Sequence, residues 1–232
     1  SSYITWQIEA LASSAQDFIY IEMWPPMVKY EDIVDIIDNA RKLSNGQPIV
    51  LALYLPIKEI VTIRLVDAFI FSSGATHIEL GENKKYLSDP YFPKYQPVES
   101  ELYTILRRYY DFFIRYEELI GPNPEINHSI IVEKPDNIWA IVRSCAGWIT
   151  VPIINLTGLE HKNWDKEQSR PKIIQNVPLH IHFQGQIEDV FWASPDSGRL
   201  DLTPMKYEQN DKKVKLTIPF LDYWGFVTLK LK

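Results

Sequence analysis

The sequence contains a single cysteine, Cys145, so no disulfide can form within the chain, and cysteine content leaves the redox compartment open. No stretch approaches about 18 consecutive apolar residues, the length that a membrane-spanning helix needs, so we expect no membrane span. The first residues, 1–3, do not show a basic segment followed by an apolar one, and we therefore expect no signal peptide within this sequence. A glycine-rich phosphate loop is also missing.

An excess of positive charge is missing as well. The formal net charge is −6 and charges of both signs are scattered, which argues against nucleic acid or an anionic membrane as the main partner. The chain is 46% hydrophobic and 13% aromatic, enough for a packed core. Its 7 Trp and 13 Tyr suit a protein that handles sugars, whose ring faces stack on aromatic side chains, but a large aromatic core would explain them equally well.

The most informative stretch is Phe18–Pro26. It begins as an apolar, β-prone run and then presents Glu22 and Trp24 before two prolines, which cannot donate ladder hydrogen bonds and so end the strand. A carboxylate at the end of a buried strand lies where α/β folds keep their chemistry. Partial desolvation beside Trp24 would raise the pKa of this carboxyl and suit it to protonate a leaving group. The alternative is a strand-end glutamate that only caps a loop.

The first 120 residues alternate between helical and strand patterns. Apolar residues at helical spacing, with acids in the first turn and bases in the last, predict a helix over 31–43 that ends at Asn45-Gly46. Apolar runs joined by helices predict a parallel sheet covered on both faces. The expected helices cover residues 6–15, 31–43, 59–68 and 99–120, and the expected strands cover 18–22, 49–54 and 69–71.

The pattern changes after the breaker cluster Gly121–Pro124, which predicts domains over residues 1–122 and 123–232. Beyond it, short alternating runs separated by Asn, Asp, Gly and Pro have the spacing of an antiparallel sandwich. The polar segment 159–175 is expected to be an exposed excursion. The expected strands of this half cover 129–132, 138–143, 148–155, 179–183, 190–193, 213–219 and 225–231.

Several separated segments of the first half resemble, in the same order, glycoside hydrolase family 66. This family contains the bacterial dextranases and the cycloisomaltooligosaccharide glucanotransferases. The second half is similar, less specifically, to the β-sandwich that follows the catalytic barrel in such enzymes. The segments that carry the resemblance are Tyr20–Pro26, Ile70–Gly74, His77–Glu82, Tyr91–Pro93 and Arg107–Phe112.

The resemblance implies an α/β fold followed by an all-β one. Residues 1–122 would form the C-terminal portion of a (β/α)8 barrel, about three βα units, and residues 123–232 an antiparallel β-sandwich. Residues 18–22, 49–54 and 69–71 would be barrel strands six, seven and eight. The implied activity is hydrolysis of α-1,6-glucosidic bonds within dextran, with retention of configuration and with Glu22 as general acid/base.

The nucleophile of the family is an aspartate that precedes the acid/base by more than the 21 residues available before Glu22. Retention needs two carboxyl groups about 5–5.5 Å apart. We therefore expect the upstream half of the same enzyme to be a partner, and residues 1–232 alone to be inactive. The expected substrate is an α-1,6-glucan, either dextran or isomaltooligosaccharides, and no cofactor is expected. Because a polymer cannot enter a cell, the expected location is outside a bacterium, at its surface or in its periplasm.

Further site residues follow from the same resemblance. His77, Glu79 and Glu82 would lie on the loop after the eighth strand, where charged side chains can bond sugar hydroxyls; the alternative is that they only shape that loop. Their spacing lacks the helical period of a zinc motif, so no metal site is expected. Trp24 would stack on the sugar or cover the barrel, and Tyr54 would bind substrate or only pack.

Two alternatives stay open. The first is the ring-forming glucanotransferase of the same family, which carries an insertion near strand seven; the short link after Tyr54 favours plain hydrolysis instead. The second is a non-catalytic carbohydrate-binding or structural fragment, which the absence of the nucleophile from this sequence would favour.

Overall fold

The structure is a computed structural model that describes residues 10, 12, 16–56, 58–89, 95–210 and 212–232. The chain divides into two compact units, residues 1–113 with 160–169 and residues 114–159 with 170–232. The domains expected over 1–122 and 123–232 stay a prediction. Of the helix expected over 6–15, the structure describes only Ala10 and Ala12. The segment 91–93 lies outside the described residues.

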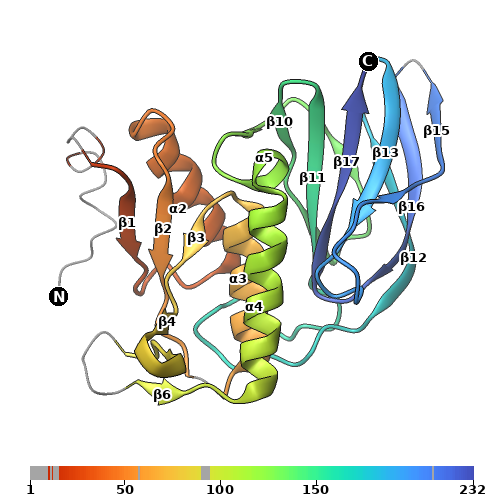
Figure 1. Cartoon of the computed structure of the whole chain (residues 1–232). Helices are drawn as coiled ribbons and strands as arrows, with labels where there is room; N and C mark the ends of the chain where they lie inside the picture. Colours follow the sequence, from red (N-terminus) through yellow and green to blue (C-terminus); the bar gives the residue numbers. More distant parts are fainter. Residues whose placement is uncertain (1–9, 11, 13–15, 57, 90–94, 211) are drawn as a thin grey trace. The chain divides into compact units, whose positions relative to one another are not determined.

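The described part of the first unit contains a three-stranded parallel sheet (Figure 1). Its strands, in order, are β1 (Ile19–Glu22), β2 (Ile49–Ala52) and β3 (Thr76–His77). Helix α2 (Tyr30–Leu43) joins β1 to β2, and α3 (Ile60–Ser72) joins β2 to β3. Since all three strands run in one direction, their carboxyl ends meet at one edge of the sheet. The remaining elements are β4 (Leu80–Gly81), η2 (Glu82–Lys84), β5 (Lys85–Tyr86), β6 (Gln96–Pro97) and α4 (Ser100–Arg115), which continues into the second unit.

Helix α2 has the predicted amphipathic spacing. The backbone N–H of Lys29 donates to Asp32 Oδ2 at 2.8 Å, which satisfies a donor at the beginning of the helix. The chain leaves the helix through Asn45 and Gly46, whose φ values are 55° and 89°, in the left-handed region that the Asn-Gly pair predicts. The buried face consists of Tyr30, Ile33, Val34, Ile36, Ile37, Ala40 and Arg41.

The third strand lies later in the chain than predicted. Helix α3 continues through Ser72, so residues 69–71 are helical and the strand expected there is wrong. Almost every residue of α3 is buried, and Phe69 stacks on Tyr30 with ring centroids 4.9 Å apart. A helix that is buried on all sides has a continuous apolar sequence, which periodicity cannot distinguish from a buried strand.

A buried arginine holds the turn between α3 and β3. The guanidinium of Arg41 donates from its two terminal nitrogens to the carbonyls of Ser73 at 2.9 Å and Gly74 at 2.8 Å. The φ of Gly74 is 75°, which a glycine adopts without strain. The arginine therefore supplies donors to two buried backbone carbonyls of the turn that follows α3.

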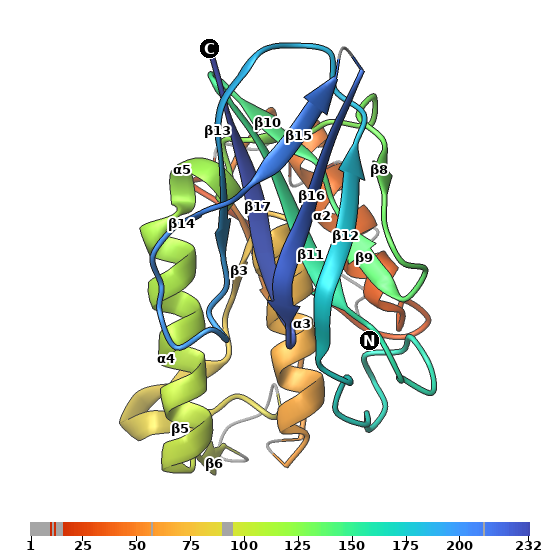
Figure 2. The ribbon, with the colours of Figure 1, turned by 90° about the vertical axis from the view of Figure 1, so that its right-hand side faces the viewer.

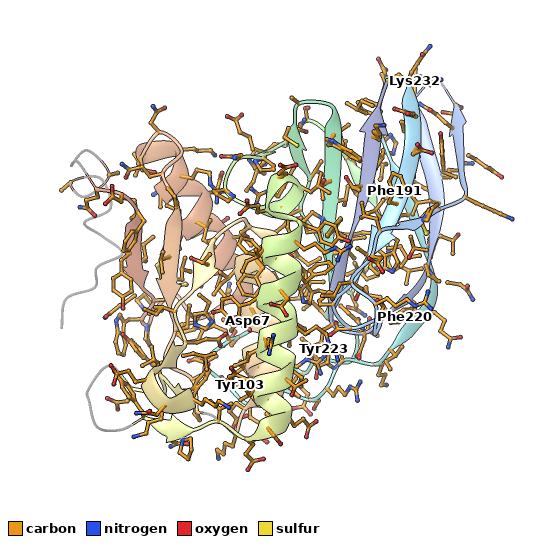
Figure 3. The ribbon with its side chains drawn as sticks, viewed as in Figure 1. Asp67, Tyr103, Phe191, Phe220, Tyr223 and Lys232 are labelled. Atoms are coloured by element: carbon orange, nitrogen blue, oxygen red, sulfur yellow. The ribbon has the colours of Figure 1, made fainter. Side chains whose placement is uncertain are left out.

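The second unit contains two antiparallel sheets, as the alternating pattern predicts (Figure 2). Buried side chains from both sheets form one hydrophobic core (Figure 3). The short helix α5 (Glu117–Ile120) precedes the strands. The larger sheet has the order β14 (Thr203–Pro204), β13 (Ile187–Ala193), β17 (Trp224–Leu231), β11 (Trp148–Asn155), β10 (Arg143–Cys145) and β7 (Glu125–Ile126), with β9 (Ile138–Ala140) also paired to β11. The smaller sheet has the order β15 (Tyr207–Asn210), β16 (Lys213–Leu221), β12 (Ile174–Ile181) and β8 (Val132–Glu133).

Part of the segment expected to be an exposed excursion belongs to the first unit. Residues 160–169 are grouped with it, and Trp164 is buried there with its indole Nε1 donating to the carbonyl of Met27 at 3.0 Å. The polar composition of the segment predicts exposure, but one buried tryptophan is enough to anchor the segment to the first unit. Within the described residues, no helix combines the length and the apolar composition that crossing a membrane requires.

Candidate active site

Glu22 is the last residue of β1 and lies opposite Ala52, the last residue of β2. The chain segments that follow these two strands carry Trp24 and Tyr54, so both aromatic residues are delivered to the same edge of the sheet. Tyr20 lies two residues before Glu22 and its side chain therefore projects to the same face of the strand. The parallel register thus assembles a carboxylate and three aromatic side chains.

The carboxylate of Glu22 accepts three hydrogen bonds. The hydroxyls of Tyr20 and Tyr54 each donate to Oε1 at 3.0 Å, and the indole Nε1 of Trp24 donates to Oε2 at 3.2 Å. The two hydroxyl oxygens lie 3.3 Å apart, and the rings of Trp24 and Tyr54 are tilted by 37° with centroids 5.6 Å apart. Both carboxylate oxygens are therefore held in one orientation, while the residue remains partly exposed.

Burial keeps the two tyrosines protonated. Desolvation raises the pKa of Tyr20, and the neighbouring hydroxyl of Tyr54 raises it further. Desolvation also raises the pKa of Tyr54. Both phenols consequently remain hydrogen-bond donors to Glu22 throughout the neutral range. Sequence reasoning missed Tyr20, although its spacing of two residues from Glu22 on one strand was the signal that could have identified it.

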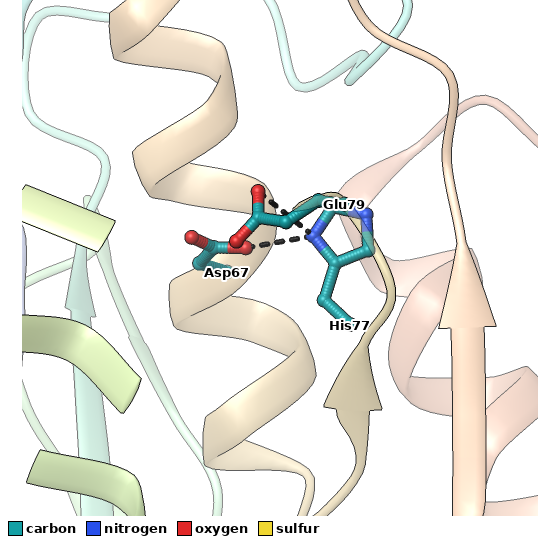
Figure 4. Close-up of side chains that lie close together, drawn as sticks. All are labelled: Asp67, His77 and Glu79. Atoms are coloured by element: carbon teal, nitrogen blue, oxygen red, sulfur yellow. Dashed lines mark hydrogen bonds and ion pairs between the residues drawn. The ribbon is translucent and has the colours of Figure 1, made fainter. Parts of the chain in front are cut away.

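His77 and Glu79 do not contact the Glu22 carboxylate but form a separate cluster with Asp67 of α3 (Figure 4). His77 Nδ1 lies 2.8 Å from Asp67 Oδ1 and 3.4 Å from Glu79 Oε2, and none of the three side chains has exposed surface. The structure therefore does not support the predicted direct contact of His77 and Glu79 with a sugar. Glu82 is exposed at the beginning of η2, and its contact with substrate stays a prediction.

The hydrogen bonds of the cluster define the protonation of His77. The backbone N–H of Leu53 points to His77 Nε2 at 3.4 Å, so Nε2 acts as the acceptor and Nδ1 carries the proton that it donates to Asp67. Burial lowers the pKa of His77, although the neighbouring Glu79 raises it. The imidazole is therefore neutral.

Burial favours the protonated form of both acids of the cluster. Burial, and then the nearby carboxyl group of Asp67, raises the pKa of Glu79 to about 8, while His77 acts in the opposite direction. Burial also raises the pKa of Asp67 well above its usual value. Asp67 was missed by sequence reasoning, but an acid in an otherwise apolar helical run was a usable signal.

The same three residues can be assessed as a metal site. One ligand atom from each of Asp67, His77 and Glu79 lies within 4.8 Å of the others, a spacing that could hold a cation. A cation on Nδ1 would place the proton on Nε2, where it would face the N–H of Leu53, another donor. A hydrogen-bonded cluster therefore fits these residues better than a metal centre does.

The chain is similar to known carbohydrate-active proteins. It is 29% identical over 189 residues to a cycloisomaltooligosaccharide glucanotransferase of Niallia circulans, covering 73% of this chain and 19% of that protein. It is 20% identical to a dextranase of Streptococcus salivarius, covering 96% of this chain and 36% of that protein. The chain thus spans well under half the length of these curated relatives.

A solved structure shows the same fold. The cycloisomaltooligosaccharide glucanotransferase of Paenibacillus sp., complexed with cycloisomaltoheptaose, superimposes with a TM-score of 0.89 at 18% identity, covering 96% of this chain and 54% of that one. The sequence pattern of Glycosyl hydrolase family 66 matches residues 3–228, which confirms the resemblance seen in the motifs. Since the match covers nearly the whole chain, the chain belongs to glycosyl hydrolase family 66.

Proposed function

We propose that the protein is a dextranase-like endo-hydrolase of α-1,6-glucosidic bonds, with Glu22 as its general acid/base. One observation carries this proposal: in a chain of this family, a partly exposed carboxylate at the end of a parallel strand accepts hydrogen bonds from three aromatic side chains. A general acid needs a fixed orientation toward the departing oxygen, and these donors supply it.

The proposed architecture extends the observed sheet. Strands β1, β2 and β3 would be strands six, seven and eight of a (β/α)8 barrel, with the eighth strand at Thr76–His77, and the second unit would be the β-sandwich that follows. Active sites of such barrels lie at the carboxyl ends of the strands, which is where Glu22 lies. The likeness of the fold to the Paenibacillus enzyme supports this architecture.

The proposed reaction has two steps. An aspartate upstream of residue 1 attacks the anomeric carbon, the glycosidic C–O bond breaks, and Glu22 gives its proton to the departing oxygen. Glu22 then takes a proton from water, whose oxygen attacks the anomeric carbon and releases the aspartate. Tyr20, Tyr54 and Trp24 hold the carboxylate in place through both steps.

The proposed substrate contacts come from the aromatic pair and from Glu82. Trp24 and Tyr54 are partly exposed beside Glu22, and their tilted rings offer apolar surface to a sugar face. The proposed partners are an α-1,6-glucan and the upstream half of the same enzyme. Because the substrate is a polymer, we place the protein outside the bacterial cytoplasm, secreted or at the cell surface or in the periplasm.

The test is the dependence of the reaction on the leaving group. In the full-length protein, Glu22→Gln is expected to lower kcat on dextran by about 10²–10⁴-fold. Formation of the glycosyl-enzyme from an aryl isomaltoside, whose phenolate leaves without protonation, should be far less affected. Azide should restore turnover of Glu22→Ala on the aryl substrate, because azide needs no general base.

Glu101→Gln makes the same chemical change as Glu22→Gln on an exposed side chain of α4 and is the matched control, expected to retain wild-type activity. Activity of Glu22→Gln on dextran within about tenfold of wild type would contradict the proposal.

A second candidate is ring-forming transfer, because the Niallia circulans and Paenibacillus relatives carry that name. The chemistry at Glu22 is shared, except that a sugar hydroxyl replaces water in the second step. Mass spectrometry separates the two, since a cyclic product lacks one water relative to the linear oligosaccharide of the same length. Linear products alone would support hydrolysis, and an abundant cyclic series would support transfer.

A further inference from the structure

The buried cluster of Asp67, His77 and Glu79 has no obvious structural purpose. All three side chains have no exposed surface, and neither Asp67 Oδ2 nor the carboxylate oxygens of Glu79 have a well-formed hydrogen bond among the described residues. Apolar side chains of similar volume would fill such an interior without leaving polar atoms unpaired. Three titratable groups at one buried position therefore call for a role other than packing.

The cluster is connected to the carboxyl end of β2. His77 pairs with Leu51 across β2 and β3, and the N–H of Ile78 donates to the carbonyl of Leu51 at 2.8 Å. Leu53 lies beyond the end of β2 and is buried, so its N–H needs a partner in the interior. The imidazole Nε2 of His77 is that partner, at 3.4 Å.

The next residue after Leu53 is Tyr54, which donates to Glu22 Oε1 at 3.0 Å. Leu53, whose N–H bonds to His77, is thus the direct chain neighbour of Tyr54, whose hydroxyl bonds to Glu22. We propose that Asp67, His77 and Glu79 form a positioning cluster that fixes the backbone at Leu53 and thereby places the Tyr54 hydroxyl on the acid/base, an inference that rests on the proposed function of Glu22.

Each member of the cluster has a defined part. Asp67 Oδ1 accepts a hydrogen bond from the Nδ1–H of His77, which leaves Nε2 as the acceptor for the N–H of Leu53. Glu79 Oε2 lies 3.4 Å from the same nitrogen, so its carboxyl group adds an electrostatic contact on this side of the ring. Tyr110 of α4 donates to the carbonyl of His77 and holds the backbone from the other side. Burial raises the pKa of both acids and so opposes the transfer of a second proton to the imidazole, which would remove the acceptor.

The test is a double-mutant cycle in the full-length protein, with kcat and KM measured on dextran. Tyr54→Phe and His77→Leu are each expected to lower kcat by about tenfold, as the loss of one hydrogen bond does, with KM changed less than about twofold. The double variant should be no slower than the slower single variant, because both changes remove the same placement of Glu22. A purely structural role for His77 would instead give effects that multiply to about a hundredfold, and that result would overturn the proposal.

A conservative set keeps the test valid if His77→Leu does not fold. Asp67→Asn preserves the acceptor oxygen for Nδ1 and should retain kcat, whereas Asp67→Leu should lose it as His77→Leu does. In the unmodified protein, ¹⁵N NMR should show the neutral Nδ1–H tautomer of His77. A charged imidazole or the Nε2–H tautomer would exclude the bond from Leu53 and overturn the proposal without any variant.

The failure of the proposed function has a different signature. If Glu22→Gln retains activity on dextran, Glu22 is not the acid/base, and both proposals fail together. If Glu22→Gln is inactive while the effects of Tyr54→Phe and His77→Leu multiply, only the positioning cluster is overturned.

Discussion

Replacing Glu79 with glutamine is expected to stabilise the protein more and more as the pH rises. Burial raises the pKa of Glu79 from 4.5 to about 8, so the folded protein keeps a proton that the unfolded chain loses in that pH range. Because the folded state binds more protons, the free energy of unfolding falls as the pH increases from about 4.5 to about 8. Glutamine is neutral at every pH and does not have this dependence.

The magnitude follows from the raised pKa. Each pKa unit corresponds to about 1.4 kcal/mol, so the rise from 4.5 to about 8 amounts to roughly 4–5 kcal/mol at pH 8. Asp67 lies in the same cluster and also has a raised pKa, so the two acids compete for protons. The free-energy change due to Glu79 alone is therefore smaller. We expect Glu79→Gln to exceed the wild type by a few kcal/mol at pH 8 and by little at pH 5.

The assay is urea unfolding followed by tryptophan fluorescence at pH 5, 6, 7 and 8, with the difference between variant and wild type taken at each pH. The difference removes the contribution of the titrating groups that do not interact with Glu79. Glu101→Gln makes the same change on an exposed side chain and serves as the control, with a difference near zero throughout. A Glu79→Gln difference that does not grow with pH would refute the protonation assigned to the cluster.

Three further outcomes are expected. Arg41→Met leaves two buried carbonyls without donors and should lower the free energy of unfolding by about 2–4 kcal/mol in urea titrations, so a loss below about 0.5 kcal/mol would be inconsistent. Phe69→Ala leaves a cavity where the ring packs against Tyr30 and should lower the free energy of unfolding by about 3–5 kcal/mol in the same measurement. Wild-type stability of this variant would contradict the packing of Phe69. Hydrogen bonds from Lys213, and then from His180 and His182, lower the pKa of Glu133 to about 2. These contacts therefore stabilise the fold above about pH 4.5, and their contribution is lost as the pH falls through about 2. Glu133→Gln should therefore lower Tm at pH 7 more than at pH 3, and equal changes would argue against the contacts.

Local signals predicted the elements whose sequence differs between a buried and an exposed face. Helix α2 follows from its period, its charged ends and the Asn-Gly stop, and β1 and β2 follow from apolar runs between helices. Helix α3 gave no such contrast, because its side chains are buried on nearly every side, and its last turn therefore reads as a strand. The burial of Trp164 depends on a contact with Met27, far away in the sequence, which no local pattern contains.

The candidate site was predictable to the same extent. Glu22 and Trp24 follow from a strand that ends in two prolines, and Tyr54 follows from the end of the neighbouring strand. The separation of His77 from this group could not be read from the sequence, because it depends on Asp67, which approaches from a helix. Spacing along the chain brings residues to the same edge of a sheet, but the depth at which each side chain ends depends on long-range packing.

The burial of α3 has a consequence for the substitutions that this chain can accumulate. A helix with one exposed face, such as α2, can drift freely at about half of its positions, since changes there meet only water. Helix α3 has almost no such positions, because ten of its thirteen residues are buried and two of the ten carry the aromatic rings of Phe69 and Phe71. Divergent relatives should therefore vary in the outer face of α2 while they keep the volume of α3, and mutational tolerance would be concentrated in one of two adjacent helices.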